Sequence, residues 1–142
     1  MTAGETAAGA RLHHIVFAVH PLALAEAARM FTELGFVFSD FELDDLGLRV
    51  LLDWDRGIEL VSPMPGETGD GSAVAEFLAS RGPGVFSVVI RVPDAPDAEE
   101  LAKRYGAEIR YRQHREGEGY ALDEVELSVR GLPLTFLSTD LP

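Results

Sequence analysis

The order of strands and helix in this chain occurs twice, and this repeat constrains the fold more than any other feature of the sequence. The first copy spans residues 11–63. Alternating apolar residues predict an opening strand over 11–19, and apolar residues at helical spacing after Pro21 predict a helix that ends at Gly35. Three further strands are expected, over 36–41, 48–54 and 58–62.

The second copy spans residues 84–142. A strand is expected over 84–92, followed by a helix that begins with Asp97 as its N-cap and ends at Gly106. Three strands follow, over 107–113, 121–129 and 132–138. We therefore predict an α+β fold of two βαβββ modules in one compact domain. They form a curved, mostly antiparallel sheet with helices on the convex face and a concave ligand cavity.

Two segments lie outside the repeat. Residues 64–83 are rich in proline and glycine and are expected to be a connector with a short helix over 73–80, capped by Ser72. Residues 1–10 lack the basic start and apolar centre of a signal peptide, and we expect a disordered tail on a cytoplasmic protein.

The composition excludes several classes of function. The 142 residues include 24 acidic and 12 basic side chains, for a net charge of −12, which argues against nucleic acid or an anionic membrane as partner. The absence of cysteine excludes disulfides, cysteine zinc sites, iron–sulfur clusters and a cysteine nucleophile. No apolar run is long enough to span a membrane.

Three stretches carry a resemblance to a known superfamily: HIVFAV at 14–19, GIELVSP at 57–63, and the run from Ser72 to Val92. They resemble the vicinal oxygen chelate superfamily of glyoxalase I, bleomycin-resistance proteins and extradiol dioxygenases, and within it the methylmalonyl-CoA epimerases. The resemblance covers residues 12–138. It implies a small-molecule enzyme with a carbonyl or acyl-CoA-like ligand, and a homodimer.

Members of that superfamily usually hold a divalent metal with four side chains, one from the first and one from the last strand of each module. Carried over by position, these fall on His14, Glu59, Ser87 and Thr135. The first two fit the family pattern, whereas the neutral hydroxyls of the last two are poor ligands for such a metal. We therefore expect no metal cofactor; if a metal is present, His14 and Glu59 are its ligands.

The same four residues are the predicted catalytic residues. Without a metal, His14 and Glu59 are expected within hydrogen-bond reach as a general acid/base pair. Ser87 and Thr135 are expected to donate hydrogen bonds to a developing oxyanion. The predicted function is metal-independent proton transfer next to a carbonyl, as in an isomerase, epimerase, dehydratase or cyclase. The alternatives are a metal-dependent epimerase-like enzyme, a ligand-sequestering protein, and a His14 that merely packs against Glu59.

Three more residues are candidates for substrate binding: Arg91, Arg49 and Trp54. Arg91 alternates with Ser87 and is expected on the same sheet face, where its planar fork suits a carboxylate or phosphate. An ion pair of Arg91 with Glu124 or Glu126 is the competing expectation. The turn acids Asp53, Asp55 and Glu116 are expected to be solvated.

Overall fold

The computed structural model describes residues 9–142; the predicted tail, 1–10, therefore falls outside the described residues except for its last two. The described chain divides into two compact units. The first unit is His14–Phe86 and includes the connector; the second is Ser87–Pro142 together with the described residues before His14. Each unit carries one βαβββ module, and the eight strands belong to a mixed sheet, so the α+β class and the duplication are confirmed.

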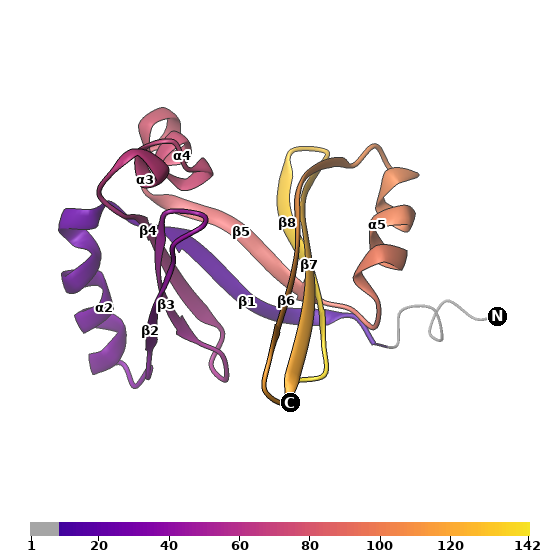
Figure 1. Ribbon diagram of the computed structural model, residues 1–142, viewed down its shortest axis with the longest axis horizontal. Coiled ribbons are helices and arrows are strands. Elements are labelled where there is room, and N and C mark those ends of the chain that lie inside the picture. Colours follow the sequence, from indigo (N-terminus) through magenta and orange to yellow (C-terminus); the bar gives the residue numbers. More distant parts are fainter. Residues whose placement is uncertain (1–8) are drawn as a thin grey trace. The chain divides into compact units, whose positions relative to one another are not determined.

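The first module has the strand order β2-β3-β4-β1. Its first and last strands, β1 and β4, pair in parallel, while β2–β3 and β3–β4 are antiparallel. Figure 1 shows α2 lying along one side of β2, β3 and β4. The elements are β1 (Arg11–Ala18), a 3₁₀ turn (Pro21–Ala23), α2 (Leu24–Glu33), β2 (Ser39–Leu43), β3 (Leu48–Asp53), β4 (Ile58–Pro63), α3 (Glu67–Asp70) and α4 (Ala73–Arg81).

Apolar side chains between α2 and the sheet form the core of the first unit. Leu24 of α2 packs with Leu51 and Leu60 of the strands, and Phe17 and Phe31 join the cluster from β1 and α2. These strand residues share one face, so the alternate residues of the same strands lie on the face away from α2.

The second module repeats the arrangement in the order β5-β8-β7-β6. β5 and β8 pair in parallel, and β7 pairs antiparallel with both β8 and β6. α5 lies beside these strands in Figure 1 and packs Ala95 and Ala102 against Val125 and Leu127. The elements are β5 (Gly84–Arg91), α5 (Ala95–Lys103), β6 (Glu108–Gly117), β7 (Tyr120–Val129) and β8 (Leu132–Thr139).

Several predicted boundaries need correction. The second long helix begins at Ala95 rather than at Asp97, because Asp94 is the N-cap and accepts a hydrogen bond from the Asp97 backbone N–H at 3.1 Å. Proline at the next position suits that first turn. β2 begins at Ser39 rather than at Phe36, whose ring packs against Phe31.

The connector is more ordered than its composition suggests. A helical turn, α3, occupies residues where only chain-breaking glycines and prolines were expected. The predicted cap of the next helix is confirmed, since the Ser72 hydroxyl accepts from the Ala75 N–H at 3.1 Å. α4 packs on β4, which ties the connector to the first module.

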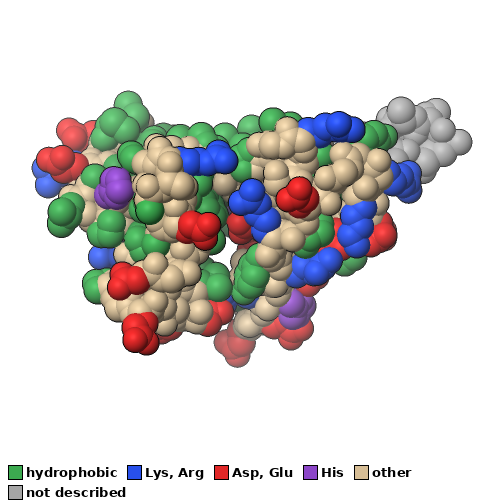
Figure 2. All heavy atoms as spheres, turned by 90° about the horizontal axis from the view of Figure 1, so that it is seen from above, with side chains coloured by type: hydrophobic (Ala, Val, Ile, Leu, Met, Phe, Trp, Pro, Cys, Tyr) green, Lys and Arg blue, Asp and Glu red, His purple; other side chains and the backbone are tan. Residues whose placement is uncertain are grey.

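The described residues contain no helix that is long and apolar enough to cross a membrane. On the face shown in Figure 2, acidic and basic side chains lie interspersed with hydrophobic ones.

Candidate functional site

Strand register places the four predicted catalytic residues at corresponding positions of the two modules. Val16 of β1 is aligned with Glu59 of β4, and His14 precedes Val16 by two residues on the same face. In the second module Val89 of β5 is aligned with Thr135 of β8, and Ser87 precedes Val89 by two residues. The two pairs are therefore equivalent within their own modules, as the sequence repeat predicts.

His14 and Glu59 form a direct hydrogen bond in the first unit. The His14 side chain is 4% exposed and that of Glu59 is 18% exposed, and His14 Nε2 lies 3.0 Å from Glu59 Oε1. Because an ionised carboxylate only accepts hydrogen bonds, Nε2 carries the proton and donates it to Glu59. Both residues lie on the face away from α2, since Leu60, the neighbour of Glu59, packs into the helix-side core.

Trp54 lies next to this pair. Its ring centroid is 6.4 Å from that of His14, with the two planes tilted by 44°. Trp54 follows β3 directly and keeps the alternation of that strand, in which Leu52 is aligned with Glu59. The predicted substrate-binding tryptophan is thus brought together with the predicted acid/base pair.

Ser87 and Thr135 form the equivalent pair of the second unit. Their hydroxyl oxygens are 2.7 Å apart and both residues are buried. Each hydroxyl can donate to only one acceptor at a time, so one of the two is committed to its neighbour and the other has a proton to give. Their role as oxyanion donors stays a prediction.

The two arginines are placed differently from each other. Arg91 aligns with Leu137 and shares the face of Ser87, as expected, but it donates to the backbone carbonyls of Thr139, at 3.0 Å, and Leu141 rather than to an acid. The expected ion pair with Glu124 or Glu126 is therefore wrong. The Nη2 group of the Arg91 guanidinium is therefore bound by the C-terminal segment and not by a substrate.

Arg49 lies apart from the His14–Glu59 pair. It aligns with Ser62, three residues beyond Glu59, and therefore projects from the opposite face of the sheet. There its Nε and Nη2 atoms donate to the two carboxylate oxygens of Asp40 at 3.1 and 2.6 Å. It lines a groove of about 560 Å³ on the α2 side of the sheet. The substrate-binding role of Arg49 stays a prediction, and its position on the α2 side separates it from the His14–Glu59 pair.

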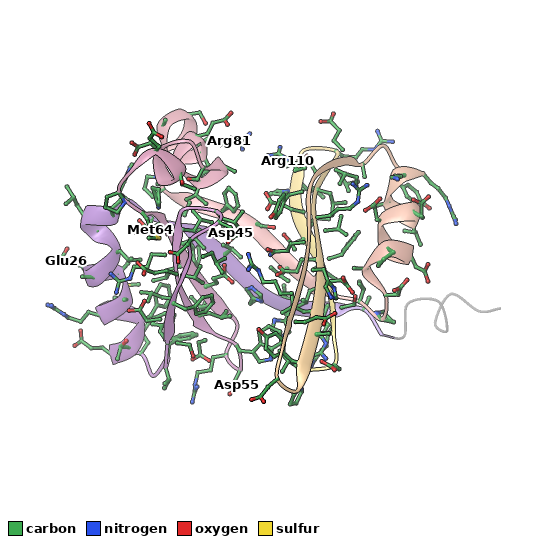
Figure 3. The ribbon with its side chains drawn as sticks, viewed as in Figure 1. Glu26, Asp45, Asp55, Met64, Arg81 and Arg110 are labelled. Atoms are coloured by element: carbon green, nitrogen blue, oxygen red, sulfur yellow. The ribbon has the colours of Figure 1, made fainter. Side chains whose placement is uncertain are left out.

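One turn acid is structural rather than solvated. Asp53 is 3% exposed and accepts hydrogen bonds from the backbone N–H groups of Val37 at 2.8 Å and Arg56 at 3.0 Å. Its neighbour Asp55 is exposed at the turn between β3 and β4, as expected (Figure 3). The two acids differ because Asp53 is the last residue of β3 and faces α2 with Leu51, whereas Asp55 lies beyond the strand in the turn.

Sequence reasoning considered Glu126 only as an ion-pair partner of Arg91 and missed its place beside the hydroxyl pair of the second unit. Glu126 of β7 is aligned with Thr135 of β8, so its side chain lies beside the Ser87–Thr135 pair on the face away from α5. Burial raises the pKa of Glu126, and the attraction of Arg110 offsets this only in part. The signal was present in the alternation of Glu124 and Glu126 with the apolar Val125 and Leu127, which face the helix.

The donor set does not fit the divalent metal that the fold family implies. In the first unit the imidazole and carboxylate are bonded to each other, and in the second unit the corresponding positions supply two hydroxyls. Among residues 9–142 no three His, Cys, Asp or Glu side chains are grouped as metal ligands.

Comparison with solved structures defines the class of fold. A hypothetical protein from Bacillus halodurans C-125 matches with a TM-score of 0.70 and 18% identity, over 94% of this chain and 96% of that one. Methylmalonyl-CoA epimerase from Mycobacterium tuberculosis matches with a TM-score of 0.62 and 23% identity, over 89% and 86%. No protein-family model and no curated protein sequence matches the chain.

A mutant 4-hydroxymandelate synthase from Streptomyces coelicolor matches with a TM-score of 0.66 and 16% identity, over 93% of this chain but only 48% of that enzyme. These neighbours and the duplicated βαβββ register identify the vicinal oxygen chelate fold, which the sequence motifs predicted. Within that fold the methylmalonyl-CoA epimerases are the named neighbours that match in size. Fold similarity does not by itself determine the reaction.

Proposed function

We propose that this protein is a metal-independent enzyme that moves a proton at a carbon next to a carbonyl, as an isomerase, epimerase, dehydratase or cyclase does. The observation that carries the proposal is the hydrogen bond of 3.0 Å between the buried His14 and the partly exposed Glu59. A charged or proton-sharing pair set into a sheet face is costly to keep unless it is used or fully satisfied.

Glu59 is the proton acceptor in this proposal. Its Oε1 accepts from His14, and its Oε2 makes no hydrogen bond within residues 9–142. The exposed part of this side chain lets a substrate reach the carboxylate, while the His14 N–H fixes its orientation. The proton passes from the substrate carbon to Glu59 and is later returned, so no electrons are exchanged with the protein.

Trp54 is the proposed wall of the substrate site. Its indole lies at 6.4 Å from the imidazole and provides an apolar surface on one side of the pair. Low polarity beside the carboxylate strengthens hydrogen bonds to a developing charge on the substrate. Trp54 is also the only tryptophan of the chain, so its fluorescence reports ligand binding at this place without a label.

Acyl-CoA thioesters are the first substrates to test, because one solved neighbour is a methylmalonyl-CoA epimerase in complex with methylmalonyl-CoA and NH4+. The protein is incubated with methylmalonyl-CoA or propionyl-CoA in D₂O, and deuterium at the carbon next to the carbonyl is followed by mass spectrometry. We expect exchange, and a decrease of about 100-fold or more in His14→Ala and Glu59→Gln. Asp55→Asn, at the exposed turn nearby, is the matched control and keeps the wild-type rate.

Three results contradict the proposal in different ways. Wild-type exchange in His14→Ala removes the pair from the reaction. Ligand-induced changes in Trp54 fluorescence that persist in His14→Ala, with no exchange by the wild type, favour the ligand-sequestering function. About one equivalent of a divalent metal in protein purified without a tag or chelator contradicts metal independence and favours the metal-dependent epimerase-like reading.

A further inference from the structure

Glu126 differs from most of the acids around it, because no described residue (9–142) forms an ion pair with it; the nearby Glu108 shares this lack of a partner but is exposed. No hydrogen bond or ion pair engages its carboxylate in that range, although the side chain is half-buried. Four acids near it have hydrogen-bond partners. Glu99 pairs with Arg112, Glu124 accepts from Gln113, and Asp123 and Glu116 both bind His114.

The oxygens of Glu126 are nevertheless accessible. No fully buried side-chain oxygen or nitrogen in the described residues lacks a hydrogen-bond partner. Because Glu126 makes no such bond, its carboxylate must reach the surface of the unit. A half-buried carboxylate that reaches a surface without a partner is arranged to meet something outside the chain.

The position of Glu126 relative to the hydroxyl pair gives it a chemical context. It is the cross-strand partner of Thr135, which places the two Cβ atoms about 5 Å apart. Thr135 in turn shares a hydrogen bond of 2.7 Å with Ser87. One carboxyl group and two hydroxyls thus lie on one sheet face of the second unit.

The two modules differ at the corresponding positions. In the first module Glu59 has an apolar residue, Leu52, as its cross-strand partner on β3. In the second module the residue at the strand position of Glu59 is Thr135, and the carboxyl is found on its partner strand, as Glu126. Each module therefore has a carboxylate in or beside its pair of corresponding residues on the face away from its helix, but on a different strand.

We infer that Glu126 is a proton-transfer residue of the second unit, which acts on a carbonyl-bearing small molecule with the Thr135 hydroxyl beside it. As a carboxylate it accepts a proton from the substrate, and as a carboxylic acid it returns one, so the group ends each cycle as it began. The substrate class rests on the proposed function; the assignment of Glu126 rests on its own geometry.

The electrostatic surroundings suit that role. Burial raises the pKa of Glu126, which brings the protonated form closer to working pH, and Arg110 near the start of β6 lowers it only partly (Figure 3). The other groups that face it are Tyr111, its partner on β6, and Glu124, two residues away on its own strand. Glu108, aligned with Ser128, and Arg115, aligned with Leu122, are the remaining charges on this face of the hairpin.

The first experiment needs no substrate. Dicyclohexylcarbodiimide is an apolar reagent that modifies protonated carboxyl groups, and peptide mapping identifies the residues it modifies. At about pH 6 we expect Glu126 to react at least about tenfold faster than Glu124, because burial raises the pKa of Glu126 and increases its protonated fraction at that pH. Glu99, whose pKa is about 2, is the internal negative control. Labelling of Glu126 no faster than Glu124 overturns the inference.

The second experiment separates this inference from the proposed function. Glu126→Gln is expected to lower deuterium exchange into methylmalonyl-CoA at least about tenfold and to remove one ionisation from the pH–rate profile, while the matched Glu124→Gln keeps the profile. Wild-type exchange with an unchanged profile in Glu126→Gln overturns the role of Glu126 and leaves that of His14 standing. Loss of exchange in Glu126→Gln but not in His14→Ala supports the role of Glu126 and overturns that of His14.

Discussion

At the scale of single residues, the contact that contributes most clearly to stability joins α5 to β6. The Arg112 guanidinium donates to both oxygens of Glu99 at 2.6 and 2.7 Å, and Lys103 lies 3.1 Å from the same carboxylate. The Arg112 hydrogen bonds lower the pKa of Glu99 to about 2, although burial acts in the opposite direction. The carboxylate is buried whereas the arginine is 59% exposed, so solvent weakens the attraction.

Glu99→Gln should therefore lower the free energy of unfolding by about 1–2 kcal/mol at neutral pH. The folded-state pKa lies below the unfolded value of 4.5, so the contribution is complete above that value and is lost as the pH falls toward 2. Urea titrations across this range should show the wild type and the variant converging at low pH. Glu100→Gln, which removes only an exposed pair with Lys103, is the control and should change stability by less than about 0.5 kcal/mol. A constant difference between wild type and Glu99→Gln at all pH values contradicts the argument.

Asp53 makes a second prediction at this scale. Its carboxylate ties the loop before β2 to the turn after β3 through the Val37 and Arg56 backbone N–H groups. Asp53→Ala leaves these donors without their partner and should cost about 2 kcal/mol, measured by thermal or urea unfolding. Asp55→Ala, two residues away and exposed, should stay within about 0.5 kcal/mol of the wild type. Equal effects of the two substitutions would show that burial of Asp53 does not matter.

At the scale of elements, the packing of α3 is the least tolerant of change. Gly47 of the β2–β3 turn approaches the backbone of α3 so closely that a Cβ there would lie 2.4 Å from Gly69 N. A Cβ on Gly69 would lie 1.7 Å from the Met64 carbonyl oxygen. These glycines therefore allow two backbone segments to touch, which explains why the connector belongs to the first unit.

Gly69→Ala should destabilise the protein by about 2–3 kcal/mol, because the backbone must move to admit the methyl group. Gly71→Ala is the matched control, since its Cβ would lie 3.4 Å from the nearest neighbouring atom, the Glu67 carbonyl oxygen. Unfolding monitored by circular dichroism should separate the two variants clearly. A Gly69→Ala protein as stable as Gly71→Ala contradicts the close approach.

The same elements show how far the sequence predicts the fold. Strands with strict alternation, such as β7 and β8, and the helix ends marked by Gly35 and Gly106 were placed within one to three residues, because their signals are local. α3 was not predicted, because its glycines are needed for contacts with a turn far away in the sequence. Local patterns carry no information about such approaches.

In the candidate site, too, some features could be predicted from the sequence and others depend on tertiary packing. The His14–Glu59 contact was predicted because the resemblance places both residues at the metal-ligand positions of one module, where side chains must lie close together. The placement of Arg49 against Asp40 depends on which face of β3 packs against the helix. Because β3 carries apolar residues on both faces, its sequence does not indicate which face that is. Alternation places Glu126 on the face of Thr135, but it was considered only as an ion-pair partner of Arg91, because the burial that raises its pKa depends on tertiary packing.

At the scale of the whole molecule, the resemblance predicts a homodimer, and the strand orders indicate where one could form. β2 and β6 end the two strand orders, and an end strand offers unpaired backbone groups to another chain. β6 carries Arg110, Arg112 and Arg115, charges that disfavour pairing with a second copy of itself. β2 is short and carries Phe41, a large apolar side chain that is 39% exposed. The β2 edge is therefore the better candidate for the dimer contact.

Sedimentation at micromolar concentration should give the mass of a dimer, about twice 15.4 kDa. Phe41→Glu should weaken the dimer at least about tenfold, since a charge on the end strand opposes pairing and the apolar contact is lost. Tyr111→Glu, a comparable exposed aromatic on β6, is the control and should leave the mass unchanged. A monomer of the wild-type chain refutes the homodimer, whereas a dimer that survives Phe41→Glu but dissociates in Tyr111→Glu moves the contact to β6. The net charge of −12 makes the outcome depend on ionic strength, so the measurement should be made at about 0.15 M salt, where charges more than about 8 Å apart are screened.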